Sequence, residues 1–146
     1  MVKCKGKVKS TNRWIIGYHV ALENRHFISL PLDIATSSCI GSEDGYQIEM
    51  FNLGPFLEVL PETVRACTNK RDKNGALIYD KDIVKVTGGS NYFGTVEFDE
   101  ACGCYFIVNH DVQLPVELSN ISSKSLEVAG NVFDTRDLLC SRSAWR

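Results

Sequence analysis

The 146-residue sequence lacks several features that would assign it to a common functional class. No apolar run comes near the roughly 18 residues of a membrane helix, and no apolar signal-peptide stretch follows the lysine-rich start. There is no Walker loop, no Rossmann glycine pattern and no metalloprotease helix motif. No segment longer than two turns follows the helical period. These absences argue against a membrane protein, a nucleotide-binding enzyme and a helical fold, and we expect a cytoplasmic protein.

The residues that are present indicate a globular protein rich in strands. Hydrophobic residues make up 44% of the chain and charged residues 23%. Most of the six cysteines lie in or beside apolar stretches, so we expect reduced thiols rather than disulfides. The net charge of -2 is unevenly distributed, because residues 1–13 carry five bases and no acid, whereas residues 14–64 carry seven acids and one base.

Short apolar or alternating runs, separated by turn signals, recur along the chain. They predict strands at 2–8, 14–22, 26–30, 46–51, 56–60, 78–79, 83–86, 94–98, 104–108 and 125–133, with short helical turns near 61–67 and 134–139. This spacing favours small barrels over a βαβ fold. We therefore predict an all-β chain of two small β-barrel halves, an N-terminal subdomain at 1–60 and a C-terminal one at 61–146.

The most distinctive segment spans residues 72–84. Asn74-Gly75 is a strong hairpin signal, because both residue types tolerate a positive φ. Asp72 is expected to cap this turn by accepting from backbone N–H groups two residues on. We expect Asp80 and Asp82 to bond backbone N–H groups at the following bend. A metal or acid–base site is the alternative, although an oxygen-only site normally needs more ligands.

With its flanks, this segment resembles the signature of the YopX family, small proteins encoded by phages and prophages. The resemblance spans residues 5–139 and includes Lys5-Gly6-Lys7, Trp14 to Tyr18, and Leu126 to Phe133. It implies a C-terminal barrel of the SH3 type and a bacterial or phage cytoplasmic origin, and it implies no activity. The signature residues, which we expect to be structural, are Trp14, Gly17, Asp72, Asn74, Gly75, Tyr79, Asp82, Gly130 and Asn131.

Two positions depart from the family pattern. Asn69 stands where glycine is usual, and Lys81 replaces the usual glycine of the bend after Tyr79. Because non-glycine residues rarely adopt a positive φ, Lys81 argues against a left-handed conformation at this bend.

Two groups of side chains could carry chemistry. Cys102 and Cys104 form a Cys-x-Cys pair, but a zinc site wants four ligands and His110 is the only nearby imidazole. We expect this pair to pack, with metal binding or redox activity as alternatives. His19 and His26 lie on facing strands of the first predicted hairpin and lack a triad partner. We therefore predict no catalytic residue, no cofactor and no enzyme.

Nucleic-acid binding is the main alternative function. Residues 82–96 also resemble the opening of KOW-type barrels, some of which bind RNA. On this reading, Tyr92 and Phe93 lie on a loop and stack on bases. A lysine stripe would contact phosphate, although a solvated edge strand guarded by lysines looks the same; it comprises Lys3, Lys5, Lys7 and Lys9. The C-terminal half, however, carries no net positive charge.

We predict a non-enzymatic phage or prophage accessory protein that binds a protein partner. That partner could be another copy of the chain, because the acidic 14–64 region could meet the basic strand of a neighbour. A metal-dependent enzyme is a third hypothesis. Four aromatic residues are core or interface candidates, and we expect most in the core: Trp14, Tyr18, Phe51 and Phe56.

Overall fold

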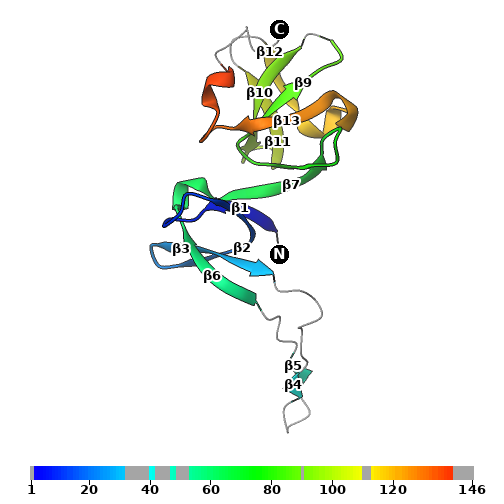
Figure 1. The fold of residues 1–146 in the computed structure, drawn as a ribbon. Helices are drawn as coiled ribbons and strands as arrows, with labels where there is room; N and C mark the ends of the chain where they lie inside the picture. Colours follow the sequence, from blue (N-terminus) through cyan, green and yellow to red (C-terminus); the bar gives the residue numbers. More distant parts are fainter. Residues whose placement is uncertain are drawn as a thin grey trace. The chain divides into compact units, whose positions relative to one another are not determined.

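The computed structural model describes residues 2–31, 40–41, 47–48, 53–89, 91–109 and 113–139. They form antiparallel sheets joined by turns and short 3-10 turns, which confirms the all-β prediction (Figure 1). No helix in this described part is long and apolar enough to span a membrane. The chain divides into two compact units, Met1–Val64 and Arg65–Arg146.

The N-terminal unit is built on a four-stranded antiparallel arrangement in the order β6-β3-β2-β1. Its elements are β1 (Lys3–Lys7), β2 (Trp14–Leu22), β3 (Arg25–Pro31), β4 (Ile40–Gly41), β5 (Gln47–Ile48), β6 (Leu53–Val59) and the 3-10 turn η2 (Pro61–Thr63). The short strands β4 and β5 pair with each other. A bridge between Val8 and Val59 joins the ends of β1 and β6, so the sheet curls around one of its faces.

The inner face of this curled sheet forms the N-terminal core. Cys4 and Val8 alternate with the lysines of the first strand and are buried, together with Ile28 and Val59. Gly17 is required by close packing. A Cβ there would lie 2.8 Å from Cγ2 of Ile28 and would collide with the carbonyl oxygen of Ser29.

The C-terminal unit contains a β7–β8 hairpin and a five-stranded sheet in the order β12-β11-β10-β9-β13. Its elements are β7 (Arg65–Arg71), β8 (Leu77–Tyr79), β9 (Asp82–Val86), β10 (Tyr92–Asp99), β11 (Cys104–Asn109), β12 (Gln113–Glu117), η3 (Leu118–Asn120), η4 (Ser123–Ser125), β13 (Leu126–Asn131) and η5 (Arg136–Leu139). The core cluster consists of Ile78, Val84, Val86, Tyr92, Val96, Ile107, Leu118 and Leu126.

Several predicted boundaries were wrong. The helical turn expected at 61–67 ends at Thr63, and a strand that we did not predict, β7, follows it. Its second half is polar and lacks an apolar alternation, which concealed it. Strands β4 and β12 were also missed, and β12 contains Pro115, a residue that strands tolerate at sheet edges. Residues 49–51 of the strand expected at 46–51 lie outside the described part of the chain.

Both positions that depart from the glycine of the family pattern have a positive φ. Asn69 has a φ of 66° and Lys81 a φ of 67°, so both residues adopt the left-handed conformation despite their side chains. The expectation that Lys81 excludes a positive φ was therefore wrong. The bend is held from both sides, because the Lys81 N–H donates to the Val96 carbonyl oxygen and its own carbonyl accepts from Val132.

Candidate functional site

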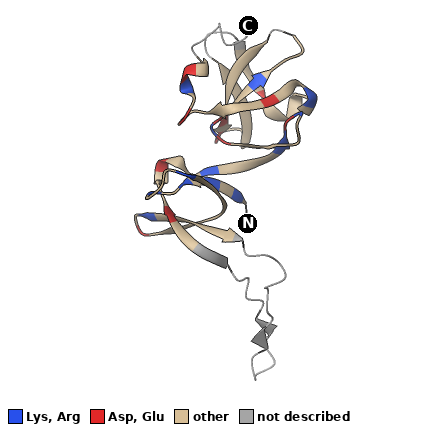
Figure 2. Cartoon of the chain, viewed as in Figure 1, with Lys and Arg blue, Asp and Glu red and all other residues tan. Residues whose placement is uncertain are grey.

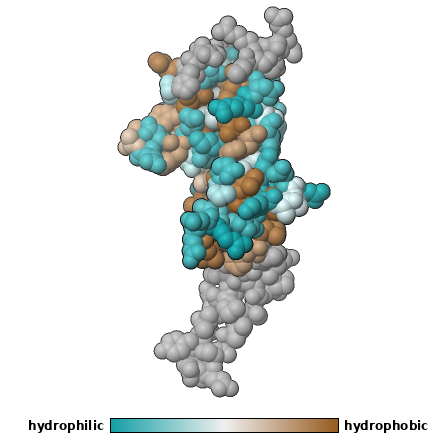
Figure 3. Space-filling model, turned by 90° about the vertical axis from the view of Figure 1, so that its left-hand side faces the viewer, coloured by the Kyte–Doolittle hydropathy of each residue, from teal (hydrophilic) through white to brown (hydrophobic). Residues whose placement is uncertain are grey.

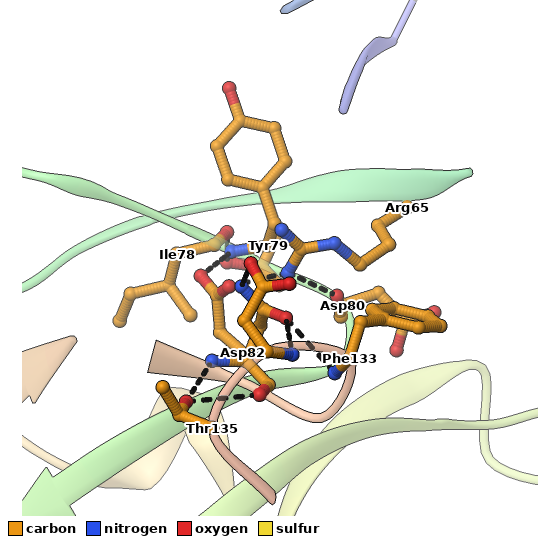
Figure 4. Close-up of polar contacts among 10 residues, drawn as sticks. Arg65, Ile78, Tyr79, Asp80, Asp82, Phe133 and Thr135 are labelled. Carbon is orange, nitrogen blue, oxygen red and sulfur yellow. Dashed lines mark hydrogen bonds and ion pairs between the residues drawn. The ribbon is translucent and has the colours of Figure 1, made fainter. Parts of the chain in front are cut away.

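Asp82, in the Asp72–Val84 segment, forms a buried ion pair with Arg65 that the sequence did not reveal (Figure 4). The guanidinium of Arg65, at the start of β7, donates to one carboxylate oxygen of Asp82 and, at 3.2 Å, to the carbonyl oxygen of Asp80. The other carboxylate oxygen of Asp82 accepts from the Tyr79 N–H at 2.8 Å. Arg65 and Asp82 are each 2% exposed. The predicted backbone bond of Asp82 is thus confirmed, and its second partner is a buried cation.

The residues around this pair come from turns of the same unit. The Arg65 guanidinium lies 5.9 Å from the centroid of the Phe133 ring, in the turn that follows β13. Asp80 lies in the turn before β9 rather than on the strand, and burial raises the pKa of its carboxyl. The pair therefore ties β7, the first strand of the unit, to β9, and Arg65 also contacts the turn that follows β13.

Asp72 organises the first turn of the family signature. One carboxylate oxygen accepts from the N–H groups of Asn74 and Ala76, each at 2.9 Å, and the other accepts from Val128 in β13, also at 2.9 Å. Burial alone would raise the pKa of Asp72, but these three backbone donors together lower it. The predicted cap is confirmed. At this turn only Gly75 has a positive φ, 82°, so the turn is a type I turn followed by a glycine bulge.

The end of the signature is a second hydrogen-bonded turn. The side-chain oxygen of Asn131 accepts from the N–H groups of Phe133 and Asp134, each at 3.0 Å. The Thr135 hydroxyl accepts from the Asn131 N–H and donates to its carbonyl oxygen. A Cβ at Gly130 would collide with this hydroxyl. The signature carboxylates and amides are therefore engaged in turn geometry.

The Cys102–Cys104 pair lies at the β10–β11 turn, with Cys102 exposed and Cys104 half-buried, so the expectation that both thiols pack was wrong for Cys102. Burial raises the pKa of the Cys104 thiol, and the nearby Glu117 carboxylate raises it further. A raised pKa lowers the thiolate fraction, which is the reactive and metal-binding form. No group of three or more potential metal ligands occurs within the described residues, and His110 lies outside them.

The two histidines of the first hairpin are in contact, as expected. Nε2 of His19 lies 2.7 Å from Nδ1 of His26, and the rings are nearly parallel, at 7°, with centroids 5.0 Å apart. That centroid distance fits two rings lying edge to edge in one plane around a shared N–H···N bond. Burial lowers the pKa of His19, and the positive charge that His26 acquires on protonation lowers it further.

The aromatic part of the nucleic-acid hypothesis was misplaced. Tyr92 and Phe93 lie in β10 rather than on a loop, and they are 4% and 7% exposed, so neither ring face is open to a base. Lys9 follows β1 in a turn, and its ammonium lies 3.8 Å from a Glu58 carboxylate oxygen. The lysine stripe that shares one face of β1 is therefore limited to Lys3, Lys5 and Lys7.

These three lysines lie on the same side of the N-terminal sheet as several aromatic side chains, because residues paired across strands point to the same side. Lys3, Lys5 and Lys7 pair with Tyr18, Ile16 and Trp14, respectively. We call this side the outer face. It carries Lys3, Lys5 and Lys7 on β1, Trp14, Ile16 and Tyr18 on β2, Arg25 and Phe27 on β3, and Phe56 and Glu58 on β6.

The outer face exposes apolar surface next to positive charge. Ile16 is 44% and Phe56 51% exposed, and the rings of Trp14, Tyr18 and Phe27 are half-buried. The expectation that most of these aromatic residues lie in the core was therefore wrong for Trp14, Tyr18 and Phe56, and Phe51 lies outside the described residues. Figure 2 shows basic residues along β1, and Figure 3 shows hydrophobic and hydrophilic residues interspersed on one side of the molecule.

Basic and aromatic groups on this face are in direct contact. The Lys7 ammonium lies 5.3 Å from the centroid of the Trp14 ring, and the Arg25 guanidinium lies 5.1 Å from that of Phe27. Arg25 also pairs with Glu58 at 2.9 Å, and this hydrogen bond lowers the pKa of Glu58. The face therefore combines four basic groups, one neutralised acid and four aromatic rings.

A comparison of the sequence with models of protein families relates this chain to one family. The family model described as "YopX protein" matches residues 34–140, which is more than half of the sequence. The match includes the Asp72–Val84 segment and the closing turn at Asn131, and it does not include the opening block at residues 5–18. No curated protein matches the chain.

Proposed function

The chain belongs to the YopX family, and we propose that it is a non-enzymatic binding module whose contact surface is the outer face of the N-terminal sheet. The observation that carries this proposal is the exposure of Ile16 and Phe56 beside half-buried aromatic rings on that face. Contiguous exposed apolar side chains rimmed by polar ones are typical of interaction surfaces. The signature carboxylates Asp72 and Asp82 support the non-enzymatic part, because they hold backbone N–H groups and a buried guanidinium.

Site-specific photocrosslinking tests this proposal without assuming the ligand. A benzophenone amino acid replaces Ile16 in the full chain, and the matched control carries it at Leu114, which is 83% exposed in the C-terminal unit. In irradiated bacterial cells we expect adducts from position 16 that disappear when Lys5→Glu and Lys7→Glu are added. Equal adduct formation at position 114, or none at position 16, refutes the outer face as the contact surface.

Self-association is the second candidate function, and a groove in the C-terminal unit favours it. This groove, of about 340 Å³, is lined by three acids, Glu97, Asp99 and Glu100, and by apolar residues that include Phe106 and Pro115. This surface complements the lysines of a second copy better than the acidic 14–64 region does, because four of the seven acids there lie outside the described residues and Glu58 is paired with Arg25.

Sedimentation velocity distinguishes self-association from a monomer. Lys5→Glu/Lys7→Glu and Glu97→Lys/Asp99→Lys should each abolish association, and an equimolar mixture of the two should restore it. A wild-type protein that stays monomeric at high concentration refutes the self-association candidate.

We also propose that the C-terminal unit is a barrel of the SH3 type. The order β13-β9-β10-β11-β12 supports this, because a four-stranded meander is followed by 3-10 turns and a strand that returns beside the first. An experimental structure in which the edge strands close on each other would establish the barrel. A phage or prophage origin and a location in the bacterial cytoplasm stay predictions.

A further inference from the structure

We propose that the ligand of the outer face is single-stranded nucleic acid, held by base stacking on the aromatic rings and by phosphate contacts to the lysines. This inference rests on the proposed function, since it names the occupant of the same surface. It differs from the sequence-based hypothesis, because it uses aromatic residues of the N-terminal sheet in place of Tyr92 and Phe93.

The charge of the face fits a polyanion. Lys3, Lys5 and Lys7 are spaced by about 6.8 Å along β1, the rise of two strand residues. Arg25 adds a fourth base on β3, and Glu58, the acid that β6 places on the described part of this face, is paired with it. A row of lysines at a regular backbone spacing suits the repeating charge of a phosphate backbone, because each neutralised phosphate releases condensed counterions.

The aromatic residues supply the second requirement, which is a set of ring faces beside that charge. Trp14 and Tyr18 lie on the strand next to the lysines, and Phe27 and Phe56 lie on the following two strands. Proteins that bind single strands combine a basic track with aromatic side chains on which successive bases stack. Every base presents an aromatic face, so stacking depends little on base identity and we expect little sequence preference.

The geometry favours unpaired strands over a duplex and over an acidic protein. A base offers its flat face only when it is unstacked from its neighbours, so a duplex could use the lysines and not the rings. An acidic peptide would likewise satisfy the lysines and leave the ring faces unmatched. A nucleotide carries an aromatic base and an anionic phosphate in every unit, so a single strand can use the rings and the ammonium groups together along its length.

Fluorescence titration of the full-length protein with a 15-nucleotide oligothymidylate tests the inference. With about three phosphates neutralised, affinity should fall about 20-fold between 50 and 200 mM salt. In a Trp145→Phe background, Trp14 is the only tryptophan, so stacking should quench the remaining emission. A 15-base-pair duplex should bind at least about tenfold more weakly and leave this emission unchanged.

Two sets of variants separate charge from stacking. Lys5→Glu/Lys7→Glu should weaken binding by more than about tenfold and flatten the salt dependence, whereas Lys124→Glu/Arg136→Glu, with the same net charge, should change it less than about twofold. Trp14→Ala should cost about tenfold in affinity, and Trp14→Phe should retain most of it. Circular dichroism and melting curves confirm that each variant is folded.

Each contrary outcome overturns a specific part. Equal affinity for the duplex, or an equal loss in the Lys124/Arg136 variant, refutes the stacked single strand. A position-16 photo-adduct that nuclease leaves intact and protease removes also refutes it, while the outer face stands as the contact surface. A nuclease-sensitive adduct supports the inference, and the absence of any adduct refutes the proposed function itself.

Discussion

The buried Arg65–Asp82 pair should dominate the stability of the C-terminal unit. Asp82→Asn keeps an acceptor for the Tyr79 N–H but removes the negative charge that is hydrogen-bonded to the Arg65 guanidinium, which is 2% exposed. Removing one partner of a buried pair typically costs about 3–5 kcal/mol. Arg65→Met should lower the free energy of unfolding by a similar amount, because it removes the cation that the buried Asp82 carboxylate is paired with. The double variant buries no charge, so we expect it to be more stable than either single variant.

Residue-resolved native-state hydrogen exchange is the appropriate assay, because the two units could unfold separately and this method assigns the loss of stability to individual strands. The free energy of opening measured at β9 and β10 amides should fall by the full loss of stability in each single variant. Amides of β2 serve as the internal control. A double-variant cost equal to the sum of the single costs would show that the charges do not interact. A cost below about 1 kcal/mol for Asp82→Asn would show that the buried charge is tolerated, contrary to our reasoning.

Three further predictions follow from individual side chains. Because the pKa of His19 is lowered in the folded state, stability should decrease as the pH falls through about 6.5, and urea midpoints at pH 5 and 7.5 should converge in His19→Gln. Because the pKa of Asp72 is lowered, its contribution is present above about pH 4 and lost as the pH falls below it; acid titration of Asp72→Asn should lack that component. Lys81→Gly should increase the free energy of unfolding by about 0.5–1 kcal/mol and raise the melting temperature, because glycine adopts the positive φ of this position without the strain that Lys81→Ala would retain. A melting temperature no higher than that of Lys81→Ala would contradict this.

Local signals allowed much of the fold to be predicted. Alternation along β1 and turn residues around Gly75 act over a few residues, so they survive without tertiary information. Two of the strands that were missed contradict local preference: β7 ends in polar residues, and β12 contains Pro115. In both, pairing with a neighbouring strand overrides the intrinsic tendency of the segment.

The two features that matter most depended on distant partners. Arg65 is 17 positions from Asp82, and an arginine is almost never fully buried unless paired, so nothing local marks it as a core residue. The outer face depends on register, because Trp14 shares a side with the lysines only while it pairs with Lys7. A shift of one residue would exchange Trp14, Ile16 and Tyr18 for Ile15 and Gly17. Gly17 disfavours that shift, because its inward position is one that only a residue without a Cβ can occupy. The same glycine that is expected in the signature for packing therefore also holds the aromatic rings on the surface that we propose for binding.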